Sequence, residues 1–142
     1  METIPALRAL FQAAHEFFDG TLAGVTSEQA AWEPPGAPAS IAAQCAHVFG
    51  AEDMGIHVLL GGGAPLYETA WAGKAGWAAA PPLYPGADVK GWARTTPIHF
   101  DALRSYGAAV HAATDAYPGA TSMAASSTSP RWVSGRSRRC SS

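Results

Sequence analysis

The stretch SIAAQCAHVFGAEDMGIHVLL, residues 40–60, decides the fold of this chain. Its large apolar residues form one arc on a helical wheel, which consists of Ile41, Cys45, Val48, Phe49, Ile56 and Leu59. Ser40 is a typical helix-capping residue, and the glycines at 61–63 favour the end of a helix. The stretch therefore predicts a long amphipathic helix from Ser40 to about Leu60.

Further helices are predicted before and after this one. From Thr3 to about Gly24, apolar residues recur at spacings of three and four, namely Leu7, Leu10, Phe11, Ala14, Phe17, Phe18 and Leu22. The segment Thr26–Trp32 predicts a short capped helical turn. Thr96-Pro97 favours the start of a third long helix, which runs to about Tyr117, because proline is tolerated in a first helical turn. We therefore expect an all-α fold.

The remaining segments are less regular. Residues 61–95 are rich in Gly, Pro, Trp and Ala, and they predict a long loop with a short turn from Asp88 to Trp92. We expect its tryptophans and Trp32 to cover the edge of the helical bundle. The helical domain is expected to span residues 1–118. Residues 119–142 are rich in Ser and Arg and lack apolar periodicity, so we expect a disordered tail.

Composition excludes several classes of protein. The formal net charge is −2, and every acidic residue precedes Arg131, so the main body is acidic and does not resemble a nucleic-acid-binding surface. Two cysteines do not make a disulfide framework. No run approaches the roughly 20 apolar residues of a membrane-spanning helix. The first residues lack the basic region of a signal peptide, so we expect a cytoplasmic location.

His47 is the first candidate for chemistry. Its helical neighbours at −4, +3 and +4 are Ala43, Gly50 and Ala51, which leave space beside the imidazole for a metal or a substrate. None of the three is a ligand, so this helix cannot bind a metal through an HxxxH pair. Any further ligand must come from another helix. The alternative is a histidine that is hydrogen-bonded in or near the core.

Glu52 and Cys45 both fall on the apolar arc of the same helix. Burying an unpaired carboxylate costs free energy, so Glu52 is expected to have either a functional role or a partner such as Arg8 or Arg104. Alternatively, a tilt of the helix would leave its side chain exposed to solvent. Cys45 is expected to behave as a small hydrophobic residue, and burial would make its thiol a poor nucleophile.

The other histidines offer weaker signals. His57 lies about 15 Å of helical rise beyond His47, so these two cannot share one metal, and we expect His57 to be solvated near Asp53. His99 and His111 are too far apart on one helix to form a single site, and both are expected at the surface.

His15 allows two interpretations. It lies four residues before Asp19, which is the spacing of an exposed helical pair. It could also point into the bundle beside Phe11 and Phe18.

Taken in order, several segments resemble the front half of the DinB-like superfamily. They are LAGVTSEQAAW at 22–32, Ser40-Ile41, His47 followed by Ala51-Glu52-Asp53, LLGG at 59–62, and DALRSY at 101–106 continuing to Tyr117. The resemblance spans roughly residues 7–118. It implies an up-down four-helix bundle with a long connection between the second and third helices.

The resemblance also implies a function. Members hold a divalent metal, zinc or nickel, on three residues that are usually histidines, and the first of these matches His47. Characterised relatives include transferases and isomerases that use a low-molecular-weight thiol, either bacillithiol or mycothiol. The composition would suit a GC-rich bacterial source, which favours mycothiol. The expected function is therefore that of a metal-dependent thiol transferase, isomerase or hydrolase acting on an unidentified small molecule.

The sequence departs from this family after Tyr117. No fourth amphipathic helix and no later histidine follow, so the remaining two metal ligands have no match. We expect weak or absent metal binding through His47 alone, and impaired activity. The tail resembles the product of a shifted reading frame or a truncated gene, a hypothesis that fails if no other frame of the coding DNA encodes an apolar helix with HxxxH.

Two alternatives to an enzyme remain open. The chain could be a non-catalytic helical module that pairs with itself, as a homodimer, or with a partner through the groove left by the missing helix. It could also be a nonfunctional fragment.

Overall fold

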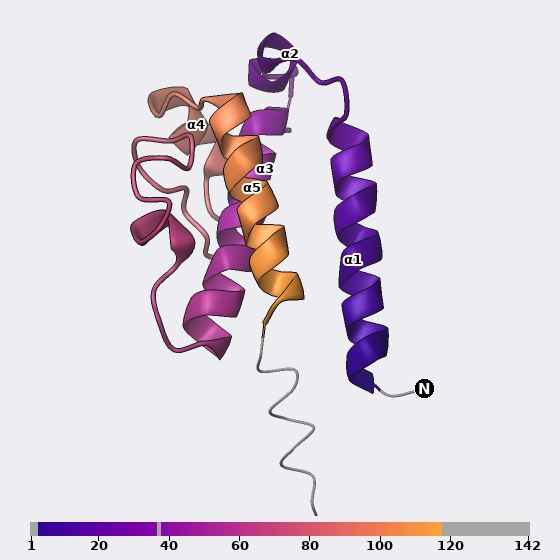
Figure 1. Ribbon diagram of the computed structural model, residues 1–142. Coiled ribbons are helices and arrows are strands. Elements are labelled where there is room, and N and C mark those ends of the chain that lie inside the picture. The colour runs from indigo at the N-terminus through magenta and orange to yellow at the C-terminus, as the bar shows by residue number, and fades with distance from the viewer. Residues whose placement is uncertain (1–2, 37, 118–142) are drawn as a thin grey trace, which may run out of the picture.

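A computed structural model describes residues 3–36 and 38–117. The segment predicted as a disordered tail lies outside the described residues. Figure 1 shows a helical molecule in which α3 and α5 lie side by side and α1 flanks them. The α-helices are α1 (Thr3–Leu22), α2 (Ser27–Ala31), α3 (Ile41–Asp53), α4 (Val89–Thr95) and α5 (Phe100–Asp115). The described residues form no β-strand, so the all-α expectation is confirmed.

The helix predicted from Ser40 to Leu60 is confirmed, although it has two parts. The hydroxyl of Ser40 accepts a hydrogen bond from the backbone N–H of Ala43 at 3.2 Å, which caps α3. Beyond Asp53 the chain continues as a π-helical segment, η1 (Met54–Leu60), and then turns at the glycines. The capped short helix after Thr26 is also confirmed, with a complete capping box to Gln29.

The core lies between α3 and α5. Phe49 of α3 packs there with three side chains of α5 that are almost fully buried, Leu103, Tyr106 and Val110. Trp71, Trp77 and Trp92 pack against this core from the long connection, as expected. Trp32 does not, because it ends α2 in an extended conformation, and its side chain is 64% exposed.

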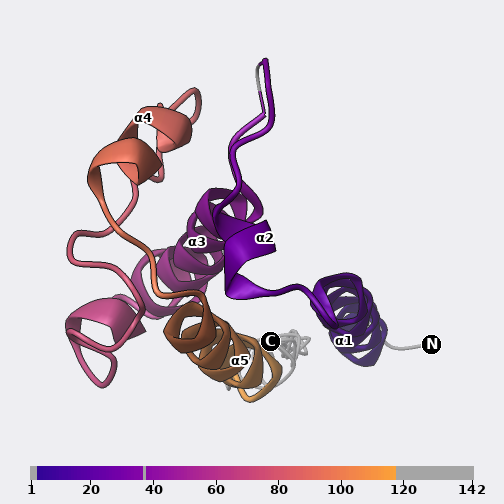
Figure 2. The ribbon, with the colours of Figure 1, turned by 90° about the horizontal axis from the view of Figure 1, so that it is seen from above.

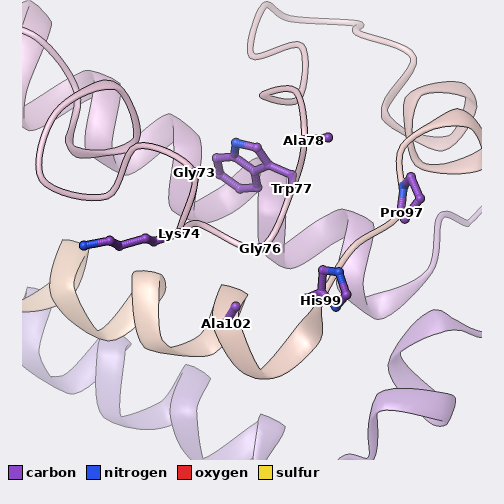
Figure 3. Close-up of a pocket in the computed structure, with 8 residues that line it drawn as sticks. All are labelled: Gly73, Lys74, Gly76, Trp77, Ala78, Pro97, His99 and Ala102. Carbon is purple, nitrogen blue, oxygen red and sulfur yellow. The ribbon is translucent and has the colours of Figure 1, made fainter.

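The long connection is mostly irregular, as expected, with a short 3-10 turn, η2 (Leu66–Glu68), and α4, which Asp88 caps. The prediction that α5 begins at Thr96-Pro97 is wrong, because the helix begins at Phe100. The backbone N–H of His99 donates instead to the carbonyl of Gly76 at 2.8 Å, and Ile98 pairs with Trp77 in an isolated β-bridge. Figure 3 shows these two segments meeting. This long-range pairing holds the residues before Phe100 in an extended conformation.

Helix α1 is confirmed, but most of its apolar stripe is exposed. The only buried residues in α1 are His15 and Leu22, whereas Leu7, Leu10, Phe11 and Phe17 are exposed. Figure 2 shows α1 standing to one side of α3 and α5. No described element covers its outer face. None of the described helices combines the length and the apolar character that crossing a membrane requires.

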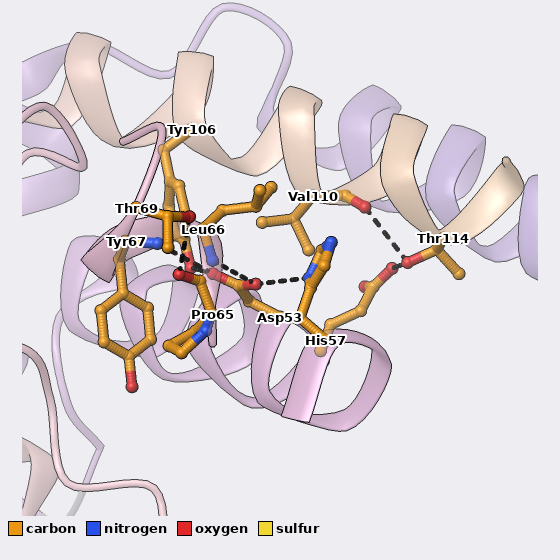
Figure 4. Close-up of polar contacts among 10 residues, drawn as sticks. Asp53, His57, Pro65, Leu66, Tyr67, Thr69, Tyr106, Val110 and Thr114 are labelled. Atoms are coloured by element: carbon orange, nitrogen blue, oxygen red, sulfur yellow. Dashed lines mark hydrogen bonds and ion pairs between the residues drawn. The ribbon is translucent and has the colours of Figure 1, made fainter. Parts of the chain in front are cut away.

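The carboxylate of Asp53 joins the end of α3 to its neighbours (Figure 4). Fully buried, it accepts hydrogen bonds from the hydroxyl of Tyr106 at 2.6 Å and from Nδ1 of His57 at 2.7 Å. It also accepts from the backbone N–H groups of Leu66 at 2.8 Å and Tyr67 at 3.2 Å. Burial, followed by the hydrogen bond to Asp53, raises the pKa of Tyr106 far above its usual range, so its hydroxyl remains a donor. His57 thus lies beside Asp53, as the sequence predicted, although its side chain is only partly exposed to solvent.

Replacing Gly107 with alanine should destabilise the fold. A Cβ at this position would lie 2.4 Å from ring atoms of the buried Phe49. We expect Gly107→Ala to lower the free energy of unfolding by about 1–3 kcal/mol, because overpacking outweighs the helix propensity of alanine. Gly20→Ala is the matched control, since its Cβ would meet no atom within 4 Å. Urea denaturation measures both, and an unchanged or raised midpoint for Gly107→Ala would contradict the packing described.

Tyr106→Phe should also be destabilising, by about 1.5–3 kcal/mol, because it leaves a buried carboxylate with one donor fewer. Tyr67→Phe is the control, since only the backbone of Tyr67 bonds to Asp53 and its hydroxyl has no hydrogen-bond partner among the described residues. Thermal unfolding followed by circular dichroism compares the two. Equal melting temperatures for both variants would show that the Asp53 network adds little.

Candidate functional site

A second polar cluster lies where α1, α3 and α5 meet. It consists of His15, Glu52 and His111, one from each helix, and we call it the His/Glu/His cluster. Nε2 of His15 donates to Oε1 of Glu52 at 2.8 Å, and Nε2 of His111 lies 3.8 Å from Oε2 of the same carboxylate. The hydroxyl of Thr114 donates to Oε1 of Glu52 at 2.5 Å (Figure 4). Both imidazoles thus direct Nε2 toward one carboxylate.

The outer nitrogens of the two imidazoles face carboxylates without bonding to them. Nδ1 of His15 lies 3.8 Å from Oδ1 of Asp115, and Nδ1 of His111 lies 3.8 Å from Oδ1 of Asp19. Both nitrogens and the Asp115 oxygen are buried and have no hydrogen-bond partner among the described residues. Buried polar atoms without partners are rare in folded proteins, because each costs free energy. The described residues alone therefore do not satisfy the cluster.

The imidazole rings of His15 and His111 lie against each other. They stack with their centroids 3.8 Å apart and their planes inclined by 5°. Burial, and then the neighbouring His15, lower the pKa of His111, which keeps a lone pair available on its ring at neutral pH. Phe49 and Phe18 pack edge-on against the His111 ring and help to exclude water from it.

This geometry fits a divalent transition metal. One ligand atom from each residue can be chosen so that all three lie within 4.8 Å of one another. Two histidines and one carboxylate form a known ligand set for catalytic zinc and for non-haem iron. Atoms that bind one ion at 2.0–2.2 Å lie about 3–4 Å apart, so small side-chain shifts would suffice.

His47 lies outside this cluster. Its Nδ1 donates a hydrogen bond to the backbone carbonyl of Pro82 at 3.2 Å. Within residues 3–36 and 38–117, His47 belongs to no group of three ligand-type side chains. Its role as a first metal ligand therefore stays a prediction.

The structure corrects several expectations about the cluster. His111 was expected at the surface, but it is 7% exposed, because it flanks the buried Val110 on the face of α5 that meets α1 and α3. For Glu52 the sequence left open a functional role, a partner such as Arg8 or Arg104, or exposure to solvent, and in the structure its partners are His15 and Thr114. Of the two interpretations of His15, the inward one is confirmed, with Phe11 beside its ring.

Two other predicted candidates behave as expected. Cys45 is buried, and burial raises the pKa of its thiol to about 11, so it is a poor nucleophile. His99 is exposed and lines a cavity of about 400 Å³ together with Lys74 and Trp77 (Figure 3). No carboxylate or thiol lines this cavity, so it offers no metal-binding set.

Comparisons with known proteins identify no relative. No protein-family model, no curated protein and no solved structure matches this chain.

Proposed function

We propose that this chain binds a divalent transition metal through the His/Glu/His cluster and belongs to the metal-dependent hydrolases or thiol transferases. The observation that carries the proposal is the convergence of His15, Glu52 and His111 from three helices, with Nε2 of both imidazoles directed at one carboxylate. An ion held by three protein ligands keeps an open position, where it lowers the pKa of a bound water or thiol and polarises a substrate.

Each residue has a definite task in this proposal. Nε2 of His15 now donates a hydrogen bond to Glu52. To bind an ion through this nitrogen, His15 would have to lose that proton or move it to Nδ1, so metal binding would release or relocate a proton. The neutral imidazoles would then carry their protons on Nδ1, facing Asp115 and Asp19. Histidine ligands in proteins commonly donate that proton to a carboxylate, which fixes the ring and strengthens the ligand. Thr114 holds the Glu52 oxygen in place.

The DinB-like resemblance supports the same class of function through a different residue. It implies a four-helix bundle, a zinc or nickel ion and a low-molecular-weight thiol, with His47 as the first ligand. Among the described side chains, the His/Glu/His cluster is the better candidate for the metal site, because no comparable set of ligand-type side chains surrounds His47. We therefore retain metal-dependent thiol or water chemistry from the resemblance and place it at the His/Glu/His cluster.

Metal binding tests the proposal directly. Titration with zinc in competition with a chromophoric chelator should show one tightly bound ion per chain. Glu52→Gln should weaken binding by at least about 100-fold, and Thr114→Val by about 10-fold, because it loses only the support of the carboxylate. His47→Gln is the matched control and should leave affinity unchanged.

Circular dichroism of each metal-free variant separates loss of a ligand from loss of the fold. Absence of stoichiometric zinc in the folded wild-type chain would refute the proposed site. Loss of binding in His47→Gln, with affinity retained in Glu52→Gln, would instead favour the ligand predicted from the sequence.

A second candidate function is self-association. It is favoured by the exposed apolar residues of α1, namely Leu7, Leu10, Phe11 and Phe17. Contiguous exposed apolar residues on a helix commonly mark an interface, and a second copy of α1 would offer an equivalent stripe.

Light scattering should then give about twice the chain mass of 14.7 kDa. Leu10→Glu should return the protein to a monomer, because it places a charge within the interface. Tyr84→Glu, which replaces an exposed residue of the long connection, should not. A wild-type monomer at high concentration would exclude this candidate.

A further inference from the structure

The three ligand-type residues of the His/Glu/His cluster are not held equally firmly. Glu52 of α3 and His111 of α5 belong to the two helices that enclose the core, and the hydroxyl of Thr114 on α5 donates a hydrogen bond to Glu52. His15 is the only member of the cluster on α1. The core therefore keeps Glu52 and His111 together, whereas His15 stays beside them only while α1 is docked.

Few contacts dock α1 on the other helices (Figure 2). None of residues 3–14 is buried. Among the described residues, the one hydrogen bond that joins α1 to another helix runs from His15 to Glu52. Beyond His15, the partly buried Phe18 and the buried Leu22 pack against the core. Segments with few buried contacts open locally at a low cost in free energy.

The connection from α1 to α2 suits a pivot. Only residues 23–26 separate the two helices, and Gly24 has a φ of +77°, a left-handed conformation that favours glycine. Leu22 and Val25, on either side of it, pack against the core. Hinges in proteins are commonly a few residues at the ends of helices or strands. The end of α1 near Leu22 is thus anchored, and the rest of the helix can swing about it.

Helix α1 also covers the two ligands that the core holds. The ring of His15 stacks on that of His111 with centroids 3.8 Å apart, and Phe18 meets the His111 ring edge-on at 6.2 Å. The side chains of His111 and Glu52 are only 9% and 17% exposed. A metal ion from solvent therefore has little access to them while α1 is docked.

We propose that α1 is a lid over the metal site, which opens to admit the ion and is then held closed by it. The proposal rests on the proposed function, because the ion is what His15 closes on. In the metal-free chain, the hydrogen bond from His15 to Glu52 keeps the lid shut. When α1 swings away, the ion binds to Glu52 and His111. When α1 returns, His15 becomes the third ligand, and its Nε2 proton moves to Nδ1 or is released.

Amide hydrogen exchange of the metal-free chain tests the opening of α1. A detached helix of about 20 residues is only marginally stable in water, so the amides of α1 exchange when it opens. We expect residues 15–22 to exchange faster than the buried face of α5. His15→Ala should speed their exchange about 10-fold further, because it removes a hydrogen bond to a charged group. Gln12→Ala, at an exposed position of the same helix, should not.

Rates of zinc uptake test whether this opening admits the ion. Leu22→Ala weakens the packing of α1 without removing a ligand. In stopped-flow mixing with a fluorescent zinc indicator, it should take up zinc at least about 10-fold faster than the wild type. Tyr106→Phe is the matched control, because it destabilises the fold at Asp53, away from α1, and it should keep the wild-type rate. Should circular dichroism show that Leu22→Ala does not fold, Phe18→Ala weakens the same packing and takes its place.

Zinc should in turn slow the exchange of residues 15–22 in the wild-type chain by at least about 10-fold at saturation, because the closed lid binds the ion more tightly. If zinc binds but does not slow this exchange, or if Leu22→Ala takes up zinc at the wild-type rate, the lid is overturned and the proposed function stands. Equal protection of α1 and α5 in the metal-free chain, or an unchanged rate in His15→Ala, would also overturn the lid alone. If zinc does not bind, the proposed function fails, and the lid fails with it.

Discussion

The carboxylate of Glu52 is the point at which three helices meet. It receives a hydrogen bond from His15 of α1 and another from Thr114 of α5, while its own backbone belongs to α3. Apart from this junction, helix α1 reaches the core through the buried Leu22 and the partly buried Phe18, so the polar junction is one of few ties between α1 and the rest of the molecule. Removing a carboxylate from water costs free energy that only well-placed donors offset. The position of α1 therefore depends on Glu52 keeping its partners.

Glu52 and Asp53 are consecutive residues, but their carboxylates have different surroundings. Asp53 is fully buried, and two side-chain and two backbone donors bond to it, so its network is complete. The surroundings of Glu52 are incomplete, since both imidazoles beside it keep a buried nitrogen without a hydrogen-bond partner among the described residues. A complete network stabilises a fold, and the proposed metal-binding role falls on the cluster whose network is incomplete. Asp53 is therefore purely architectural, whereas Glu52 both holds α1 in place and carries the proposed chemistry.

Local patterns in the sequence predicted much of the fold. The cap at Ser40, the apolar periodicity and the glycines at 61–63 located the helix that carries both carboxylates, because these signals depend only on neighbouring residues. The start of α5 was misplaced because a distant segment, around Gly76, pairs with the backbone before Phe100. Likewise, the apolar stripe of α1 indicated a helix but could not show which of its faces packs inward.

The site was harder to predict than the fold. Glu52 was singled out because a carboxylate on an apolar arc needs a partner, yet that partner is 37 residues away on another helix. His111 gave no sequence signal apart from its place next to Val110. Such a cluster arises only when three helices pack together, and no spacing rule within a single helix reveals it.

The most direct test is a long-range proton–nitrogen correlation spectrum of the five histidine side chains, recorded before and after one equivalent of zinc. The account predicts that the Nε2 signals of His15 and His111 shift to metal-bound positions, while those of His47, His57 and His99 remain unchanged. A shift at His47 with His15 and His111 unaffected, or no shift at any histidine, would contradict it.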